Sequence, residues 1–142
     1  MFDTLASQIG AVFVVVVCGF AFLKGDEPER LVAGVFVLGW FAALLGQGAA
    51  DLYTVSLIVL LIDIVALLVL GAMIWKSRRT WIIWACACQL LVVTGHFMMQ
   101  IDLRPSAASY IIILNLAGYG VLLALAVGTF WAWQERRAAG LE

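Results

Sequence analysis

Charged residues are scarce in this chain. Of its 142 residues, 12% are Asp, Glu, Lys or Arg and 65% are hydrophobic, and the mean hydropathy is +1.11. Soluble domains carry roughly 25% charged residues. The composition therefore predicts an integral membrane protein, and the chain has no basic run of the kind that binds nucleic acid.

Catalytic motifs are also missing. The chain has one histidine and three cysteines, and it contains no HExxH, GxSxG or phosphate-binding glycine-rich loop. Cys86 and Cys88 would lie about 200° apart on a helix, so they are poorly placed to hold one metal. A cysteine inside an apolar segment usually serves as a small apolar filler. Neither a hydrolase nor a nucleotide-driven pump is indicated, and we do not expect an enzyme.

What the sequence does have is long apolar segments. They cover residues 4–23, 31–50, 52–75, 80–101 and 106–133. A segment of about 20 apolar residues can cross a bilayer as a helix, which satisfies its own backbone hydrogen bonds. The first ten residues, MFDTLASQIG, lack the positive region of a signal peptide, so we expect the first segment to be retained as an anchor. We predict an all-α integral membrane protein with a single five-helix transmembrane domain over residues 1–142.

The positive charges separate by side when five spans are assumed. One side receives Lys24, Arg30, Lys76, Arg78, Arg79, Arg136 and Arg137, whereas the other receives only Arg104. The positive-inside rule then places the N-terminus outside and the C-terminus in the cytoplasm. Five tryptophans are expected in an interfacial belt on the cytoplasmic side: Trp75, Trp81, Trp84, Trp131 and Trp133.

Asp63 is the one acidic residue in the central part of the third segment. Its carboxyl group would lie near the bilayer midplane, where a charge costs at least about 2.5–3.5 kcal/mol. Such a group needs a partner, a proton or water. Gln89 is expected at the same depth on the next, antiparallel helix, so we predict that Asp63 and Gln89 share a hydrogen bond or a water molecule.

Further polar residues are expected between Asp63 and the outer surface. The candidate ligand-binding or ion-binding residues are Asp63, Gln89, His96, Gln100, Asn115, Tyr53 and Gln47. Gln89, His96 and Gln100 recur at helical spacing and form one stripe of the fourth helix, which we expect to face the bundle interior. Two interpretations remain open, because polar side chains also serve as ordinary links between helices.

Small residues recur at helical spacing on two segments. Gly39, Ala43 and Gly46 do so on the second, and Gly120, Ala124 and Gly128 do so on the fifth. Such faces let a neighbouring helix approach closely. We expect close-packed interfaces there, either within the chain or between copies.

Three classes of function fit these observations. The first, which the sequence favours over the other two, is an accessory subunit that packs against another membrane protein or further copies of itself. The second is a small transporter, channel or ligand-binding protein with an outer-facing polar cavity around Asp63 and His96. The third is an electron carrier with haem or a metal bound by His96, although a lone histidine is a weak metal signal. In each case the chain is a multi-pass protein of a cell membrane, with a bacterial inner membrane as the expected location.

Overall fold

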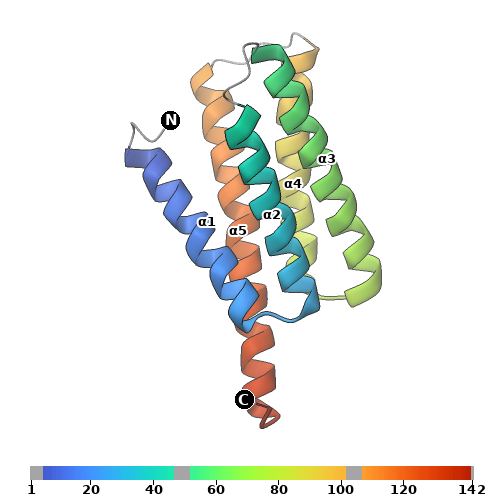
Figure 1. Cartoon of the computed structure of the whole chain (residues 1–142). Helices are drawn as coiled ribbons and strands as arrows, with labels where there is room; N and C mark the ends of the chain where they lie inside the picture. Colours follow the sequence, from blue (N-terminus) through green and yellow to red (C-terminus); the bar gives the residue numbers. More distant parts are fainter. Residues whose placement is uncertain (1–4, 47–51, 102–106, 142) are drawn as a thin grey trace.

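The described residues of the computed structural model form five α-helices, one for each predicted segment. The structure describes residues 5–46, 52–101 and 107–141. The helices are α1 (Leu5–Lys24), α2 (Glu27–Gly46), α3 (Leu52–Ser77), α4 (Thr80–Gln100) and α5 (Ala107–Ala138). They run alternately up and down, and the last turns of α5 extend beyond the other helices (Figure 1). The predicted all-helical fold is confirmed.

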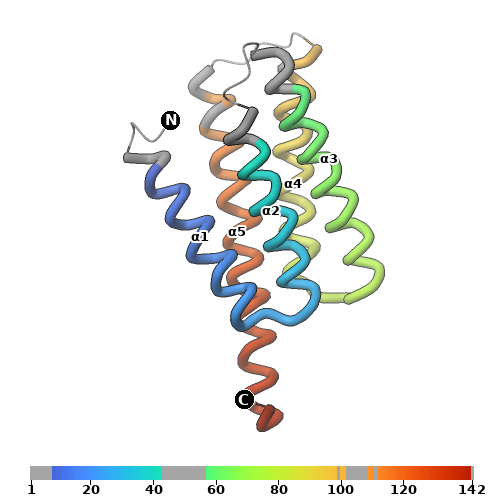
Figure 2. The backbone as a smooth tube through the Cα atoms, in the orientation of Figure 1, coloured from blue at the N-terminus to red at the C-terminus, as the bar shows by residue number. Residues whose placement is uncertain are grey.

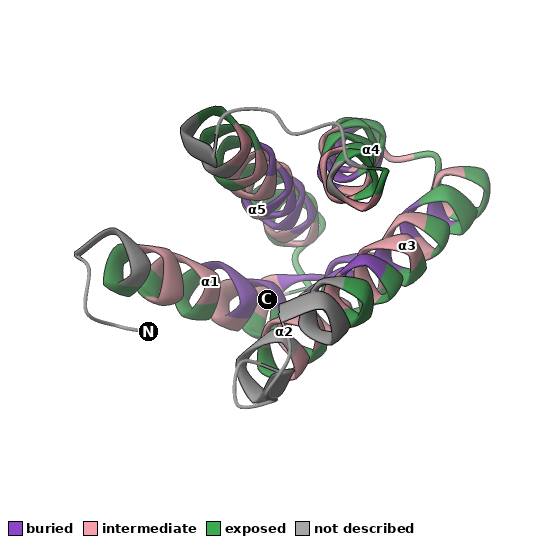
Figure 3. Cartoon of the chain, turned by 90° about the horizontal axis from the view of Figure 1, so that it is seen from above, coloured by how far each residue is buried: buried purple, intermediate pink, exposed green. Residues whose placement is uncertain are grey.

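The helices pack side by side as a ring in chain order. Each helix contacts the next, α5 closes the ring against α1, and the contact between α4 and α5 is the most extensive. Seen from above, α1, α2 and α3 form one side of the ring and α4 and α5 the other (Figure 3). Polar side chains on α3, α4 and α5 are therefore close enough to meet.

Within the described part of the chain, three helices are long and apolar enough to cross a membrane. The stretches concerned are Leu57–Ser77 in α3, Thr80–Met98 in α4 and Ile112–Ala138 in α5, and Gln8–Lys24 in α1 is a shorter apolar stretch. Large apolar side chains such as Leu68 and Leu116 are exposed on the outside of the ring. Exposed apolar surface of this extent on such helices indicates a membrane protein.

The small-residue faces lie against neighbouring helices. A Cβ atom built on Gly39 would lie 2.9 Å from Ile62 on α3, and one built on Gly120 would lie 2.7 Å from Cys88 on α4. At Gly128 the same atom would lie 2.5 Å from the ring of Trp81. The predicted close packing is confirmed at these glycines, and the helices that approach closely there belong to the same chain. The surroundings of Ala43 and Gly46 lie outside the described residues.

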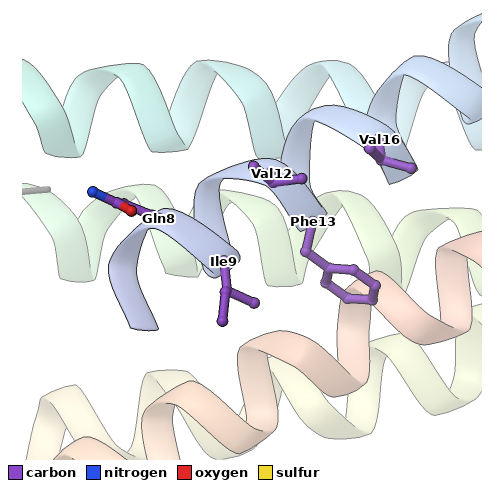
Figure 4. A pocket seen from close by; sticks show the side chains of 5 residues that line it. All are labelled: Gln8, Ile9, Val12, Phe13 and Val16. Atoms are coloured by element: carbon purple, nitrogen blue, oxygen red, sulfur yellow. The ribbon is translucent and has the colours of Figure 1, made fainter. Parts of the chain in front are cut away.

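The first helix diverges from the ring at one end. Its end near Lys24 lies close to α5, whereas its opposite end lies apart from α5 (Figures 1 and 2). An apolar groove of about 370 Å³ lies along the diverging part, lined by Gln8, Ile9, Val12, Phe13 and Val16 (Figure 4). Phe13 extends toward α5 and meets the edge of Tyr119. The lining of the groove is almost entirely apolar, and Gln8 is its one polar residue.

Candidate functional site

Asp63 on α3 and Gln89 on α4 form a direct hydrogen bond. Gln89 Nε2 donates to Asp63 Oδ1 at 2.9 Å and to the main-chain oxygen of Asp63 at 3.2 Å. The Gln89 side chain is only 2% exposed, so water does not compete strongly for its amide. The predicted contact between these two residues is confirmed.

His96 reaches the same carboxyl group from farther along α4. Its Nε2 lies 3.3 Å from Asp63 Oδ2, although His96 comes seven residues, or about 10 Å of helix rise, after Gln89. Side chains on a helix lean toward its N-terminus. Because α3 and α4 are antiparallel, Asp63 and His96 lean toward each other, and this closes the distance.

Tyr110 on α5 adds a link that the sequence analysis missed. Its hydroxyl lies 3.0 Å from His96 Nδ1, and the two rings meet edge to face with centroids 6.1 Å apart. From the sequence, a tyrosine near the start of an apolar helix is interpreted as an aromatic residue at the membrane interface. Tyr110 contacts the His96 imidazole only because of how α5 is rotated against α4. Gln89, Asp63, His96 and Tyr110 thus form a continuous polar chain across three helices.

The other predicted site residues lie outside this polar chain or outside the described residues. Asn115 is exposed, about 140° around α5 from Tyr110. Gln100 is half-buried near the end of α4. Gln47 and the side chain of Tyr53 lie outside the described residues. Three of the candidates, Asp63, Gln89 and His96, are therefore brought together.

The groups in the polar chain are suited to exchanging protons. A carboxyl, an imidazole and a phenol stand in series, and both ring nitrogens of His96 face a partner. Among the residues that the structure describes, no three His, Cys, Asp or Glu side chains are grouped as a metal site would require.

A second polar cluster lies at the other end of the bundle, at the turns that join α1 to α2 and α3 to α4. We call it the charged-end network; its members are Asp26, Glu29, Arg79, Trp81 and Arg136. Arg79 donates to Glu29 Oε1 and Asp26 Oδ2, both at 2.9 Å, and Trp81 Nε1 donates to Glu29 Oε1 at 3.0 Å. Arg136 donates to Asp26 Oδ1 and to the main-chain oxygen of Lys24. Residues from both turns and from α4 and α5 are thus linked.

The start of α2 explains why two carboxylates meet there. The main-chain N–H of Asp26 donates to Glu29 Oε2 at 3.0 Å, which is half of a capping box at the helix N-terminus. The sequence predicts the position of Glu29 at this positive helix end. It does not predict that the Glu29 side chain is fully buried, because burial depends on Arg79 and Trp81 folding over it.

Arg79 is held in its charged form by this network. Burial opposes the positive charge, but the hydrogen bond to Asp26 and the negative charges of Glu29, Asp26 and Glu135 outweigh it and raise the pKa of Arg79 above its ordinary value. The Arg79 guanidinium therefore remains charged across the whole physiological pH range.

Trp81 corrects one prediction. It was expected in an interfacial aromatic belt together with Trp75, but it is packed inside the bundle and only 7% exposed, whereas Trp75 is 91% exposed. The indole of Trp81 fills the space left by Gly128, and its N–H is satisfied by Glu29. Exposed Trp84 and Trp131 do have the surface position expected of belt residues.

The comparisons with known proteins give no further guidance. No protein-family model, no curated protein and no solved structure matches the chain.

Proposed function

We propose that all five helices span a cell membrane, with the N-terminus outside and the C-terminus in the cytoplasm. The separation of Lys and Arg supports this orientation, because seven of the eight lie on the side of the charged-end network when five spans are assumed. A bacterial inner membrane is the proposed location. In this orientation the polar chain lies in the outer half of the membrane, and the charged-end network lies at the cytoplasmic surface.

Within that frame the protein is a small transporter or channel, and the Asp63–His96 pair is its working site. The observation that carries this proposal is the continuity of the polar chain. It begins at Gln89 and Asp63, near the middle of their helices, and ends at Tyr110, in the first turn of α5. An ionisable residue at the centre of a membrane helix is by default a functional group, since its burial is costly.

A purely structural role explains the polar chain less well. Gln89 bonds only one carboxyl oxygen of Asp63, the second carboxyl oxygen faces His96, and His96 in turn faces Tyr110. Close helix packing elsewhere in the bundle needs no such series of ionisable groups, because small residues alone permit it between α2 and α3 at Gly39 and between α4 and α5 at Gly120 and Gly128.

The electron-carrier hypothesis is the least supported of the three. A haem or metal ligand needs an unengaged ring nitrogen, but His96 Nε2 faces Asp63 and Nδ1 faces Tyr110. Binding an iron atom would require one of these contacts to break. We therefore do not place a cofactor at this site.

An accessory role in a larger membrane complex is the second candidate function. The observation in its favour is Gly71, which is exposed on α3, with nothing within 4 Å of a Cβ atom built there. A helix of another membrane protein, or of a second copy, could approach closely at this point. Co-purification of a defined partner that is lost in Gly71→Leu, with ion flux absent, would favour this candidate.

The test of the transporter proposal is flux through purified protein in liposomes. Wild-type protein should conduct protons or small cations, and Asp63→Asn should abolish that flux while the helix content and unfolding midpoint are retained. Thr94→Val is the matched control, because the exposed Thr94 hydroxyl donates only to Leu90 O in its own helix turn. Absence of any flux in folded wild-type protein would reject the proposal.

A further inference from the structure

Resting on the proposed function, we infer that the species bound by the polar chain is a proton, and that it enters from the outer side through Tyr110 and His96 to Asp63. The inference comes from the hydrogen-bonding capacity of the three side chains. The two contacts that join them can each be a hydrogen bond in two ways, and the two ways differ by one proton.

In the first arrangement Asp63 is a carboxylate and His96 is neutral. The Tyr110 hydroxyl donates to His96 Nδ1 across 3.0 Å, and the Nε2–H of His96 points to Asp63 Oδ2 across 3.3 Å. Nδ1 must accept here, because a neutral imidazole has one donor and one acceptor nitrogen.

In the second arrangement the same two contacts, Tyr110–His96 and His96–Asp63, are kept but reversed in direction. The protonated Asp63 donates from Oδ2 to His96 Nε2, and the Nδ1–H of His96 donates to the Tyr110 oxygen. His96 remains neutral, as the other tautomer, and Tyr110 keeps one hydrogen, now turned away from the ring. This state therefore holds one more proton than the first, and its net charge is zero instead of −1.

The transfer between the two arrangements balances simply. A hydronium ion at the outer side gives its proton to the Tyr110 oxygen and becomes water. The original Tyr110 O–H bond breaks as a bond to His96 Nδ1 forms, and the Nε2–H bond of His96 breaks as an O–H bond to Asp63 Oδ2 forms.

Gln89 acts as a positioning residue in this exchange. Its Nε2 donates to Asp63 Oδ1 at 2.9 Å and can do so in both arrangements, because that oxygen remains an acceptor in each. Oδ2 is thereby reserved for the mobile proton. Gln89 Nε2 also donates to the main-chain oxygen of Asp63 at 3.2 Å, and this second bond holds the amide in place beside the carboxyl group.

The surroundings of Asp63 favour a proton over a metal cation. Its titratable neighbours are His96 and Tyr110, from α4 and α5. On α2, which also packs against α3, the charged residues among those described are Glu27, Glu29 and Arg30, at the far end of the helix. A hard divalent cation takes about six oxygen ligands, far more than one carboxyl and one phenol supply.

The first experiment is an infrared pH titration of the wild-type protein in lipid. Protonation of Asp63 should appear as a carboxylic acid carbonyl band as the pH falls, and the band should be missing in Asp63→Asn. Neither Na⁺ nor K⁺ should shift its midpoint. The titration of the wild-type protein does not depend on any variant, so it can be measured even if Asp63→Asn does not fold.

The second experiment measures proton flux in liposomes for Tyr110→Phe. This change keeps the ring against His96 and removes only the hydroxyl, so the Asp63 band should still form, but proton flux should fall about 100-fold, as expected for loss of a proton-transfer group. Thr94→Val should match the wild type in both measurements. Unchanged flux in Tyr110→Phe would overturn the proposed entry route.

The two proposals fail in different ways. If Asp63 never titrates but Na⁺ or K⁺ flux depends on it, the proton inference is wrong and the transporter proposal survives. If folded wild-type protein shows neither titration of Asp63 nor flux of any ion, both are rejected.

Discussion

The polar chain and the charged-end network both place ionisable side chains among apolar helices, but they are built differently. The network matches the two carboxylates of Asp26 and Glu29 with the guanidinium groups of Arg79 and Arg136, and Glu29 is fully buried. The polar chain has one carboxyl group facing neutral or titratable partners, and both Asp63 and His96 are half-buried.

The difference indicates which cluster is structural. Fixed opposite charges hold one arrangement, and removal of either partner leaves a buried charge uncompensated. The Asp63–His96–Tyr110 series instead tolerates a change of proton count without losing a hydrogen bond. We therefore expect the network to determine stability and the polar chain to determine activity.

The largest expected effect on stability is that of Glu29→Gln. The change keeps the size of the side chain but removes the buried charge that faces Arg79, while Asp26 still faces it at 2.9 Å, so the free energy of unfolding should fall by about 3 kcal/mol. Denaturation in SDS, monitored by circular dichroism, measures it. A double-mutant cycle with Arg79→Gln should give a large coupling energy, and additive effects would contradict the network.

Gly128→Ala should be the next most damaging change. The new Cβ would lie 2.5 Å from the Trp81 ring, which cannot shift freely while its N–H is bonded to Glu29. Overpacking of this kind costs about 1–3 kcal/mol. Gly118→Ala is the matched control, because nothing lies within 4 Å of a Cβ there. Equal unfolding midpoints for the two variants would contradict the packing.

Asp63→Asn should have little effect on stability. The asparagine can accept from Gln89 and donate to His96 Nε2, which reproduces the protonated arrangement, so the free energy of unfolding should change by less than about 1 kcal/mol. The same SDS denaturation measures it. A loss as large as that of Glu29→Gln would erase the distinction between the two clusters.

Arg78→Gly should have the smallest effect, and in the opposite direction. Arg78 is exposed and has a φ of 51°, a left-handed conformation that favours glycine after a helix end. The change should stabilise the protein by at most about 1 kcal/mol, since glycine also loosens the unfolded chain. Because Arg78 neighbours Arg79 in the same turn, a large destabilisation would show that the turn itself, and not the network, controls stability.

Much of the helix arrangement and half of the polar chain could be predicted from the sequence. The five helices followed from apolar segment lengths, and the Asp63–Gln89 contact followed from depth on consecutive antiparallel helices. The close packing at Gly39, Gly120 and Gly128 followed from small-residue spacing. Each of these inferences needs only residue spacing along a helix of known rise, so local geometry was sufficient.

The tertiary structure alone decided which residues complete each cluster. Tyr110 meets His96 because of how α5 is rotated against α4, and Trp81 is buried because Gly128 leaves space that the indole fills. Glu29 is buried because Arg79 arrives from a turn 50 residues away in the sequence. Helical periodicity sets the depth of a residue and its position around its own helix, whereas the face of the neighbouring helix that it meets depends on packing between them.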